Sequence, residues 1–446
     1  MTAPDTIAAV ATASGRGGIG VIRVSGPAAG RIAVAIAGRL PSPRVATFAP
    51  FRDAAGRLLD EGIALFFPAP GSYTGEDVLE LQGHGGPWVM RELLAACVAG
   101  GARLAEPGEF TRRAFLNGRM DLAQAEGVAD LIDAASAEAA RGAARSLSGE
   151  FSRRIHALVE GLTELRLHVE ACIDFPEEQI DPADRRWQLD RAGTLAADLD
   201  DVLSKASQGA VLRDGLTVVL AGAPNVGKSS LLNRLADEEV AIVAPVPGTT
   251  RDTVRASLTL QGVPLHLVDT AGLRETGDVV ERLGIERTWA ALEGAGAVLV
   301  ISDASQHPGG EDDLILSRLP AGLPVARIRN KIDLAGESAS QEDREGAMRI
   351  SLSAKTGEGV EALRAWLLAL AGWQPHGEGV YVARQRHLEA LGQARRHLAS
   401  AVSSQQVFEL MAEELKLAQN ALGAITGALS ADDLLGRIFS HFCIGK

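Results

Sequence analysis

The chain has 446 residues, of which 46% are apolar, carries a net charge of −13 and contains three cysteines. A chain of this length is too long for one hydrophobic core and is predicted to form about three domains. Its negative net charge argues against indiscriminate nucleic-acid binding, which needs clustered Lys and Arg. No stretch reaches the ~18 uncharged apolar residues of a membrane helix, the N-terminus lacks a secretory pattern, and the cysteines have no metal-ligand spacing. We therefore expect a cytoplasmic protein that does not associate with membranes.

Residues 1–118 are predicted to form a compact α+β domain. Short apolar runs at 19–24, 63–67 and 78–81 alternate with glycine-rich turns, and a helical stretch spans 89–98. The mixture of short strands and a helix sets the class of this domain.

From about residue 119 the sequence becomes rich in alanine and charged residues, with few glycines or prolines. Apolar residues between 151 and 169 recur with helical spacing, and Arg and Glu fill the positions between them. The same texture returns after a short Gly/Pro/His linker. Residues 119–213 and 374–446 are therefore predicted to be the two parts of one discontinuous α-helical domain.

Residues 214–373 interrupt this helical domain with alternating strands and helices. The runs at 216–220, 265–268, 297–301 and 325–329 have the length and continuous apolar character of buried strands. Insertion is physically reasonable because the termini of a compact domain often lie close together. We predict an inserted Ras-like α/β domain of the P-loop type, or G domain.

Residues 222–229 fit the pattern G-x-x-x-x-G-K-[ST], directly after an apolar run and before a helical one. The glycines let the backbone wrap phosphates, and the N-terminus of the following helix faces their charge. Lys228 would reach the β and γ phosphates, and the hydroxyl of Ser229 would bind Mg²⁺. The predicted nucleotide contacts in this P-loop are Asn225, Val226, Gly227, Lys228, Ser229 and Ser230.

Three further segments complete a predicted GTP site. Asp269 ends a predicted strand and begins Asp-Thr-Ala-Gly, which places a carboxylate near magnesium and a glycine N–H near the γ phosphate. Asp333 can accept hydrogen bonds from the N1–H and the N2 amine of guanine, a donor pair that adenine lacks. A later loop would offer a backbone N–H to the guanine O6. The predicted contacts are Asp269, Thr270, Ala271, Gly272, Asn330, Lys331, Asp333, Ser353, Ala354 and Lys355.

The sequence Pro-Gly-Thr-Thr-Arg-Asp at 247–252 is predicted to be a switch I loop, in which Thr250 reaches Mg²⁺ and the γ phosphate. Leu273 stands where many Ras-like enzymes have a glutamine that orients the attacking water. Another group must therefore hold the water. Nearby carboxylates, each alternatively a solvated helix charge, are Glu275, Asp278, Glu281 and Glu286.

With these motifs the chain resembles the bacterial MnmE (TrmE) family of tRNA-modification GTPases over essentially its whole length. The resemblance rests on the G-domain motifs and on Glu-Arg-Leu-Gly-Ile-Glu at 281–286. It is reinforced by the sequences at 71–77, 83–86 and 107–118. The chain ends in Phe-Cys-Ile-Gly-Lys at 442–446, which is highly specific to the family.

The resemblance implies a homodimer in which the N-terminal domain binds folate. With an FAD-dependent MnmG-type partner, in a heterotetramer, the family installs an aminomethyl or carboxymethylaminomethyl group at C5 of the wobble uridine of certain tRNAs. The one-carbon unit comes from 5-formyl- or methylene-tetrahydrofolate, and GTP hydrolysis controls this chemistry. Hydrolysis is activated when G domains dimerise around K⁺, whose charge replaces that of an arginine finger.

Carried onto this chain, the resemblance implies three groups of functional residues. Mg²⁺ is bound by Ser229 and Thr250, and Glu281 is the catalytic carboxylate that positions water. The K⁺ ligands are the side chain of Asn225, the backbone of Ala244 and Val246, and Thr249. The folate site consists of Arg23, Glu80, Arg119 and Lys446.

Two of these positions depart from the family pattern. Ala244 stands where a threonine is common, so that only its carbonyl is available to K⁺. Arg119 stands where a lysine is usual, and the two cations differ in shape. The contacts to K⁺ and to folate are therefore expected to differ in detail.

Two other classes of function compete with this interpretation. A ribosome-assembly GTPase has a similar P-loop and switch I, but it carries a KH-type module or a second G domain, and the sequence contains neither a Gly-x-x-Gly loop in a C-terminal βα module nor a second P-loop. A GTP-dependent scaffold that remodels membranes would need a basic amphipathic or apolar membrane segment, for which the sequence gives no support.

Overall fold

The computed structural model forms two compact units. The first comprises Met1–Ala129, Ser152–Thr163 and Gln419–Lys446, and the second comprises Asp130–Phe151 and Glu164–Ala418. The residues that the structure describes are 5–174, 182–236, 254–269, 295–306, 316, 319–320, 322–344, 347–373, 379–428, 435, 438–440, 442–443 and 445.

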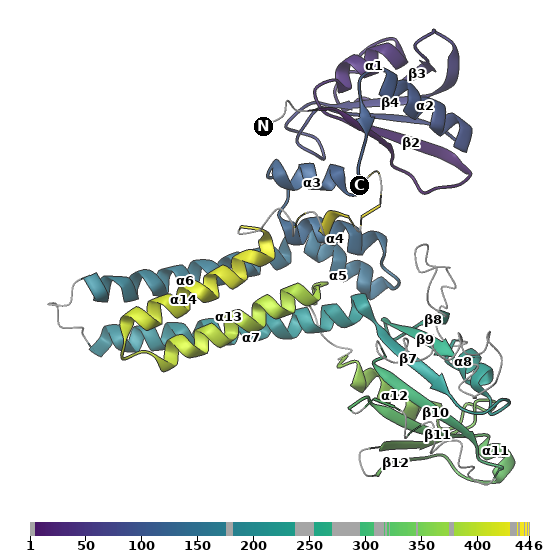
Figure 1. Cartoon of the computed structure of the whole chain (residues 1–446), viewed down its shortest axis with the longest axis vertical. Helices are drawn as coiled ribbons and strands as arrows, with labels where there is room; N and C mark the ends of the chain where they lie inside the picture. The colour runs from purple at the N-terminus through teal and green to yellow at the C-terminus, as the bar shows by residue number, and fades with distance from the viewer. Residues whose placement is uncertain are drawn as a thin grey trace. The chain divides into compact units, whose positions relative to one another are not determined.

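A six-stranded sheet dominates the first unit (Figure 1). Helices α1 (Ala29–Ala37) and α2 (Pro87–Ala99) pack on one of its faces, where Ile22, Leu79 and Leu81 are fully buried. The predicted strands and helix lie inside β2, β4, β5 and α2, so the α+β class is confirmed. The strand order is β3 (Thr47–Arg52), β4 (Leu58–Phe67), β5 (Val78–Gly85), β2 (Gly17–Ser25), β1 (Ile7–Val10) and β6 (Arg103–Leu104).

The C-terminal segment of the chain returns to this first unit. Leu122 of α4 (Leu122–Ile132) packs in one cluster with Phe439 and Phe442, close to α3 (Glu109–Leu116), whose Phe115 borders the same cluster. Helices α6 (Glu150–Asp174) and α14 (Phe408–Thr426) are joined where the amide of Gln419 donates to Thr163 Oγ1 at 2.6 Å. The first unit thus combines both ends of the chain.

Long helices form much of the second unit. Helix α7 (Pro182–Asp214) packs against α13 (Gln385–Ser403), and α5 (Ala137–Leu147) packs against α7. Hydrogen bonds from Arg191 to Glu164 and between His397 and Glu414 link further pairs of helices. The helical texture predicted from the sequence is therefore confirmed on both sides of the inserted domain.

Leu410 is apolar, but it does not belong to the buried stripe of α14. Its side chain is 56% exposed, whereas Met411 and Leu415 are fully buried. Residues 411, 415, 418 and 422 are spaced by three or four, which places them on one face of the helix. Leu410 precedes Leu415 by five residues and therefore points away from that face.

The inserted domain is built on a seven-stranded sheet. Its five inner strands run parallel, and antiparallel strands lie at both edges. The four predicted strands lie inside β7, β9, β10 and β11. The strand order is β12 (Ser340–Arg344), β13 (Ala347–Ser351), β11 (Val325–Asn330), β10 (Ala297–Asp303), β7 (Leu216–Ala221), β9 (Val263–Asp269) and β8 (Val254–Leu260).

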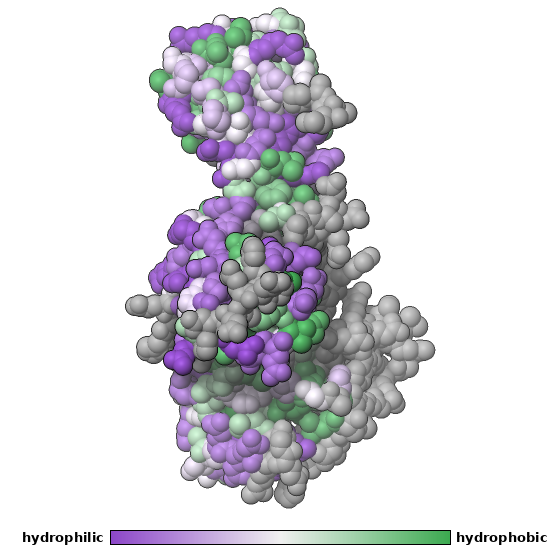
Figure 2. All heavy atoms as spheres, turned by 90° about the vertical axis from the view of Figure 1, so that its left-hand side faces the viewer, coloured by the Kyte–Doolittle hydropathy of each residue, from purple (hydrophilic) through white to green (hydrophobic). Residues whose placement is uncertain are grey.

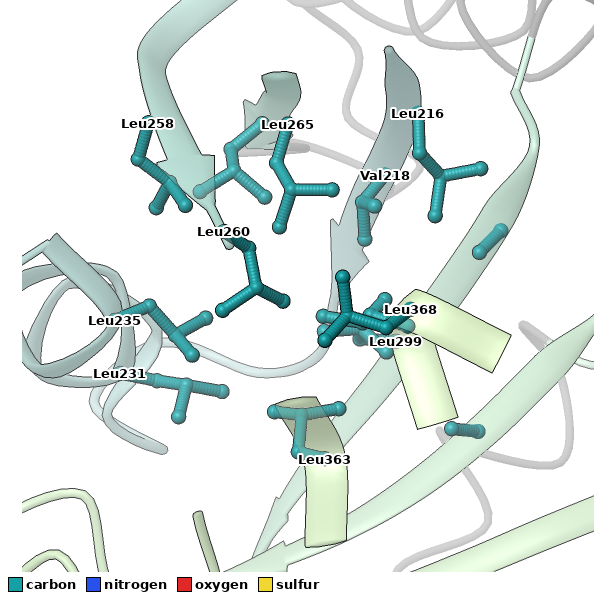
Figure 3. Packing of buried hydrophobic residues seen from close by; sticks show 14 of the residues in the cluster. Leu216, Val218, Leu231, Leu235, Leu258, Leu260, Leu265, Leu299, Leu363 and Leu368 are labelled. Carbon is teal, nitrogen blue, oxygen red and sulfur yellow. The ribbon is translucent and has the colours of Figure 1, made fainter. Parts of the chain in front are cut away.

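Both faces of this sheet are buried. On one face, leucines of the strands point toward Leu231 and Leu235 of α8 (Lys228–Ala236) and Leu363 of α12 (Val360–Leu370) (Figure 3). The other face forms a separate cluster that contains Val219, Val298 and Val300. Alternating strand residues thus enter two cores, as expected for a doubly wound α/β domain. The chain is therefore multidomain, with an α+β N-terminal domain, a helical domain and an inserted P-loop α/β domain.

In the view of Figure 2, hydrophilic residues of the described part of the chain are interspersed with smaller hydrophobic patches. Large apolar side chains that are exposed include Ile19 and Phe48 of the N-terminal sheet. Among the helices of the described residues, none is long and apolar enough to cross a membrane.

Candidate functional site

The carboxyl ends of the parallel strands bring the predicted motifs of the inserted domain to one edge of the sheet. In the strand register, Leu220 lies opposite Asp269, and Asp303 lies opposite Asn330. Strand β13 ends beside Arg329 of β11. Ligands of open α/β sheets bind outside this edge. It is therefore the candidate site.

The P-loop connects β7 to α8 and depends on glycine at two close approaches. A Cβ on Gly222 would lie 2.2 Å from the carbonyl oxygen of Ile301, and one on Gly227 would lie 2.2 Å from Asn330 Nδ2. Both glycines and Asn225 have positive φ, with 65° at Asn225. This left-handed backbone turns the loop tightly and leaves no room for side chains against the neighbouring strands. The loop has the wrapped form that phosphate binding requires.

Lys228 opens α8 and reaches back over the loop. Its ammonium donates to the carbonyl oxygens of Gly222 at 2.6 Å and Ala223 at 3.0 Å. Ser229 and Ser230 are exposed in the first turn of the helix, where unpaired backbone N–H groups and the helix dipole favour an anion. A cation, exposed hydroxyls and a helix N-terminus therefore meet at one point, as a phosphate chain with a divalent metal would need.

Asn330 ties three segments together. Its Nδ2 donates to the carbonyl of Val226 at 2.8 Å, and its Oδ1 accepts from the backbone N–H of Ala354 at 2.9 Å. The residue is only 1% exposed, so loss of either bond would leave a buried polar atom unpaired. The P-loop, strand β11 and the loop after β13 are thus held in one arrangement.

Asp333 lies in the short helix α11 (Ile332–Ala335), immediately after β11. The hydroxyl of Ser353 donates to its carboxylate at 2.7 Å and in turn accepts from the backbone N–H of Thr356 at 3.2 Å. Ser353 is fully buried, so its hydroxyl fixes the orientation of the carboxylate. The structure therefore brings together Asp333 and the loop at 353–355, as the sequence predicted.

Asp303 belongs to this edge but was missed by sequence reasoning. It ends β10, and its carboxylate accepts from Lys331 Nζ at 2.7 Å and from the hydroxyl of Ser305 at 2.6 Å. Burial opposes ionisation of Asp303, but the hydrogen bonds from Lys331 and Ser305 outweigh it and lower the pKa of the carboxyl. The signal that could have found it is an aspartate at the end of an apolar strand, as at Asp269.

A second cluster lies in the N-terminal domain. Arg23 of β2 and Glu80 of β5 are directly opposite each other, and Glu80 Oε1 accepts from Arg23 Nε at 3.0 Å and Nη2 at 2.9 Å. The guanidinium lies over the rings of Tyr73 and Phe110, at 5.3 and 5.8 Å from the ring centroids. The pair is mostly buried, with side-chain exposures of 15% and 17%.

The end of the chain lies at this cluster. Arg23 Nη1 donates to the carbonyl of Gly445 at 3.4 Å, and a Cβ on Gly445 would lie 2.3 Å from the carbonyl of Val10. Of the other predicted folate residues, Arg119 lies against the loop that carries Tyr73, because a Cβ on Gly75 would lie 3.2 Å from Arg119 Cγ. Lys446 lies outside the described residues.

The predicted switch and catalytic residues also lie outside the described part of the chain, and for Asp269 only the backbone is described. The structure therefore tests neither their positions nor their contacts. These residues are Ala244, Val246, Thr249, Thr250, Thr270, Ala271, Gly272 and Glu281.

Comparison with known proteins gives matches over nearly the whole chain. Residues 122–443 match the family model of the MnmE helical domain, and residues 6–119 match that of the GTP-binding protein TrmE N-terminus. A tRNA modification GTPase MnmE of Azoarcus sp. (strain BH72) is 58% identical over 447 residues, which cover 99% of this chain and 98% of that protein. The protein of the same name from Thiobacillus denitrificans is 59% identical over 443 residues, again 99% and 98%.

Among solved structures, the G domain of the T. maritima FeoB iron transporter is 28% identical, covers 35% of this chain and 98% of its own, and has a TM-score of 0.27.

The P-loop between β7 and α8, together with the Asn-Lys-x-Asp segment after β11, defines a P-loop GTP-binding protein. Nearly full-length relatives at 58% and 59% identity narrow this class to one family. The chain belongs to the MnmE family of tRNA-modification GTPases, and it is a GTP hydrolase that acts in tRNA modification.

Proposed function

We propose that the chain uses GTP hydrolysis to control installation of an aminomethyl or carboxymethylaminomethyl group at C5 of the wobble uridine of tRNA. It does so in a heterotetramer with an FAD-dependent MnmG-type partner, in the cytoplasm, and the one-carbon unit comes from 5-formyl- or methylene-tetrahydrofolate. The observation that carries this proposal is the likeness to tRNA modification GTPases over 99% of the chain.

The guanine-nucleotide site is proposed to use the residues predicted from the sequence. Lys228 would leave the carbonyls of Gly222 and Ala223 and bind phosphate oxygens instead, since both are acceptors for the same ammonium. Ser229 and Thr250 would hold Mg²⁺, which when bound neutralises charge on the phosphates. The exposed hydroxyl of Ser229 at the start of α8 supports the magnesium assignment.

Hydrolysis is proposed to require a K⁺ ion held at the P-loop. Asn225 is exposed and has a φ of 65°, so that its side chain extends from the tight turn of the loop. The remaining ligands would be the carbonyls of Ala244 and Val246, with Thr249. Glu281 would position the attacking water, because Leu273 has no polar atom with which to do so.

The N-terminal domain is proposed to bind the reduced folate. Arg23 offers a cation next to aromatic rings, and Glu80 offers a carboxylate beside it, which suits a ligand with both carboxylates and a hydrogen-bonding ring system. Arg119 and Lys446 would add positive charge. The carbonyl of Gly445 at the Arg23 guanidinium supports a role for the chain end in this site.

A homodimer is proposed to form through the N-terminal domain. Phe48, Ile63, Gln82 and Val21 lie opposite one another in successive strands, so that they form one row across the sheet. Phe48 is 66% exposed, and Ile63 is 38% exposed. Exposed apolar side chains grouped in this way are expected where a second copy packs.

We also propose a division of the chain at the sequence-derived boundaries. The N-terminal domain would span 1–118, the first part of the helical domain 119–213, the G domain 214–373, and the second helical part with the C-terminal tail 374–446. Two proteins would test this division: the fragment 214–373, and residues 1–213 joined to 374–446 by a short linker. If the boundaries are right, each should fold and unfold cooperatively on its own.

The experiment that tests the proposed function is the modification profile of wobble uridines in tRNA from cells that lack the protein. Loss of the C5 group, restored by the wild-type chain but not by Glu281→Ala, would agree with control by hydrolysis. Glu337→Ala, at an exposed acidic residue of the inserted domain, serves as the control. An unchanged profile in cells without the protein would refute the proposal.

A further inference from the structure

Arg234 makes an unusual pair of contacts from the last turn of α8. Its Nε donates to the carbonyl of Ala354 at 3.0 Å, and its Nη2 donates to the carbonyl of Lys355. The two carbonyls belong to consecutive residues of the loop after β13, far away in the sequence. One guanidinium thus clamps the backbone of that loop onto the helix that begins at the P-loop.

The clamped loop is otherwise fixed on its opposite side. Asn330 accepts from the N–H of Ala354, and a tight turn is closed by the bond from the Gly357 N–H to the Ser353 carbonyl at 2.9 Å. Gly357 has a φ of 89°, and a Cβ there would lie 3.9 Å from the Arg234 guanidinium. Arg234 therefore spans the turn and joins it to α8, whereas Asn330 joins it to the P-loop.

The chemistry of the side chain suits this task. A guanidinium is planar and holds its N–H donors in a fixed fork, so that it can satisfy two neighbouring carbonyls at once, whereas an ammonium acts as a point charge. A cation at the C-terminal end of α8 is also favoured by the helix dipole, but that effect alone does not require contact with residues 354 and 355.

We infer that Arg234 is a positioning residue for recognition of the guanine O6. It sets the distance between the phosphate-binding helix and the loop at 353–355, so that a backbone N–H of the loop meets O6 while the phosphates occupy the P-loop. This inference rests on the proposed role of the loop in reading O6. The phosphate and base halves of the site are thereby coupled through one side chain.

Three nucleotides separate the contributions to binding by the full-length protein. GTP offers O6, N1–H and the N2 amine, ITP lacks the amine, and 2-aminopurine riboside triphosphate keeps the amine but lacks O6 and N1–H. The ratio of GTP to ITP affinity reports on Asp333. The ratio of GTP to 2-aminopurine nucleotide affinity also contains the contribution of O6.

Calorimetric titration of Arg234→Ala should show GTP and ITP binding weakened by about tenfold, as expected for loss of a charged hydrogen bond. Affinity for the 2-aminopurine nucleotide should fall much less, so that the ratio of GTP to 2-aminopurine nucleotide affinity falls while the ratio of GTP to ITP affinity is kept. In steady-state GTP hydrolysis, Arg234→Ala should raise KM and leave kcat unchanged. Arg234→Lys should recover part of the affinity, and the neighbouring Asn233→Ala should match wild type.

Equal weakening of all three nucleotides, or no weakening, would overturn the inference, because a general structural role would not select O6. If Arg234→Ala does not fold, Arg234→Lys carries the same comparison of ratios. Failure of the proposed base-reading role is distinguishable, since the wild-type protein would then bind the 2-aminopurine nucleotide as tightly as ITP.

Discussion

The ammonium of Lys331 lies 2.7 Å from the Asp303 carboxylate, across the ends of the neighbouring parallel strands β10 and β11. The Asp303 side chain is 5% exposed, and Lys331 has a φ of 68°, a left-handed conformation that is uncommon for a side-chain-bearing residue. The buried carboxylate therefore holds Lys331 where the backbone turns from β11 into the guanine-reading segment. Lys331 belongs to the Asn-Lys-x-Asp segment, whereas Asp303 belongs to none of the motifs predicted from the sequence.

Asp303→Asn should weaken GTP binding by roughly tenfold, because the amide keeps the shape but no longer pairs with the ammonium of Lys331. The matched control is Glu337→Gln, which removes the exposed partner of Arg329 and should change affinity by less than about twofold. Calorimetric titration with GTP measures both. Equal affinities for Asp303→Asn and wild type would show that Lys331 needs no such partner.

Asp333→Asn should exchange the preference for guanine for a preference for xanthine. The amide can donate to the O2 of xanthine but cannot accept from the guanine amine as the carboxylate does. The hydroxyl of Ser353 donates to Asp333 Oδ1 at 2.7 Å. The oxygen of the substituted amide can accept the same hydrogen bond, which would hold the side chain in place. Titration with GTP and XTP should show opposite changes. Unchanged GTP affinity would mean that the base is read elsewhere.

The nucleotide site was largely predictable because each motif is contiguous and lies at the end of an apolar strand. Gly222, Lys228 and Asp333 could thus be placed on one edge from their motifs and the apolar strands that precede them. The contacts of Asp303 with Lys331 and of Arg234 with Ala354 could not be predicted, because the two partners lie 28 and 120 residues apart in the sequence. For Asp303, the end of an apolar strand marks the position but not the partner. Such pairs are created by the order of the strands, which a sequence pattern does not contain.

In the N-terminal domain, even less of the site could be predicted from the sequence. Its α+β class follows from short apolar runs, but the order β3-β4-β5-β2-β1-β6 interleaves strands far apart in the chain. Only that order places Arg23 opposite Glu80. Family resemblance, rather than residue chemistry, grouped these two residues in advance. Leu410 shows a different limit, since apolar character alone does not say which side of a helix a residue occupies, and the phase of α14 leaves it 56% exposed.

GTP hydrolysis should be faster in K⁺ than in Na⁺ at equal ionic strength. Asn225 extends from the left-handed turn of the P-loop, where an amide oxygen can replace a water of a monovalent cation. Rb⁺ should substitute in part, being similar in size. In Asn225→Ala the difference between K⁺ and Na⁺ should disappear, whereas Asn233→Ala should keep it. Steady-state phosphate release measures the rates, and equal rates of the wild-type protein in both salts would contradict the K⁺ mechanism.

Acid should destabilise the N-terminal domain through Glu109, which is 7% exposed and bonded to Arg103 and Arg113. Burial raises the pKa of its carboxyl, but the hydrogen bonds from Arg103, the Glu106 N–H and Arg113 outweigh burial and lower it below the ordinary value of 4.5. A carboxyl with a lowered folded-state pKa stabilises the fold above its unfolded pKa, and this stabilisation is lost as pH falls through the folded value.

Glu109→Gln should therefore lower the free energy of unfolding at neutral pH and flatten its decline below pH 4.5. Hydrogen exchange of peptides from β1 and β2, corrected for the intrinsic pH dependence of exchange, reports this free energy in the full chain. The matched control is Glu92→Gln, a partly exposed residue whose carboxylate pairs with the exposed Arg91. Parallel pH curves for Glu109→Gln and wild type would show that the ion pairs contribute nothing.

Arg23→Ala should weaken binding of 5-formyltetrahydrofolate by at least about tenfold, because it removes a charge-assisted partner for a carboxylate and takes away the guanidinium that pairs with Glu80. Arg23→Lys should recover less than half of this free energy. An ammonium keeps the charge but cannot hold the two-point contact to Glu80 Oε1 while stacking on Tyr73.

The matched control is Arg52→Ala, at an exposed residue of the edge strand β3, and this variant should bind folate as wild type does. The titration must use the full-length protein, because the Gly445 carbonyl accepts from Arg23 and the chain end is therefore part of the surroundings of this side chain. Equal affinities of Arg23→Ala and Arg52→Ala would place the folate elsewhere, and a loss in both would point to a general effect of surface charge.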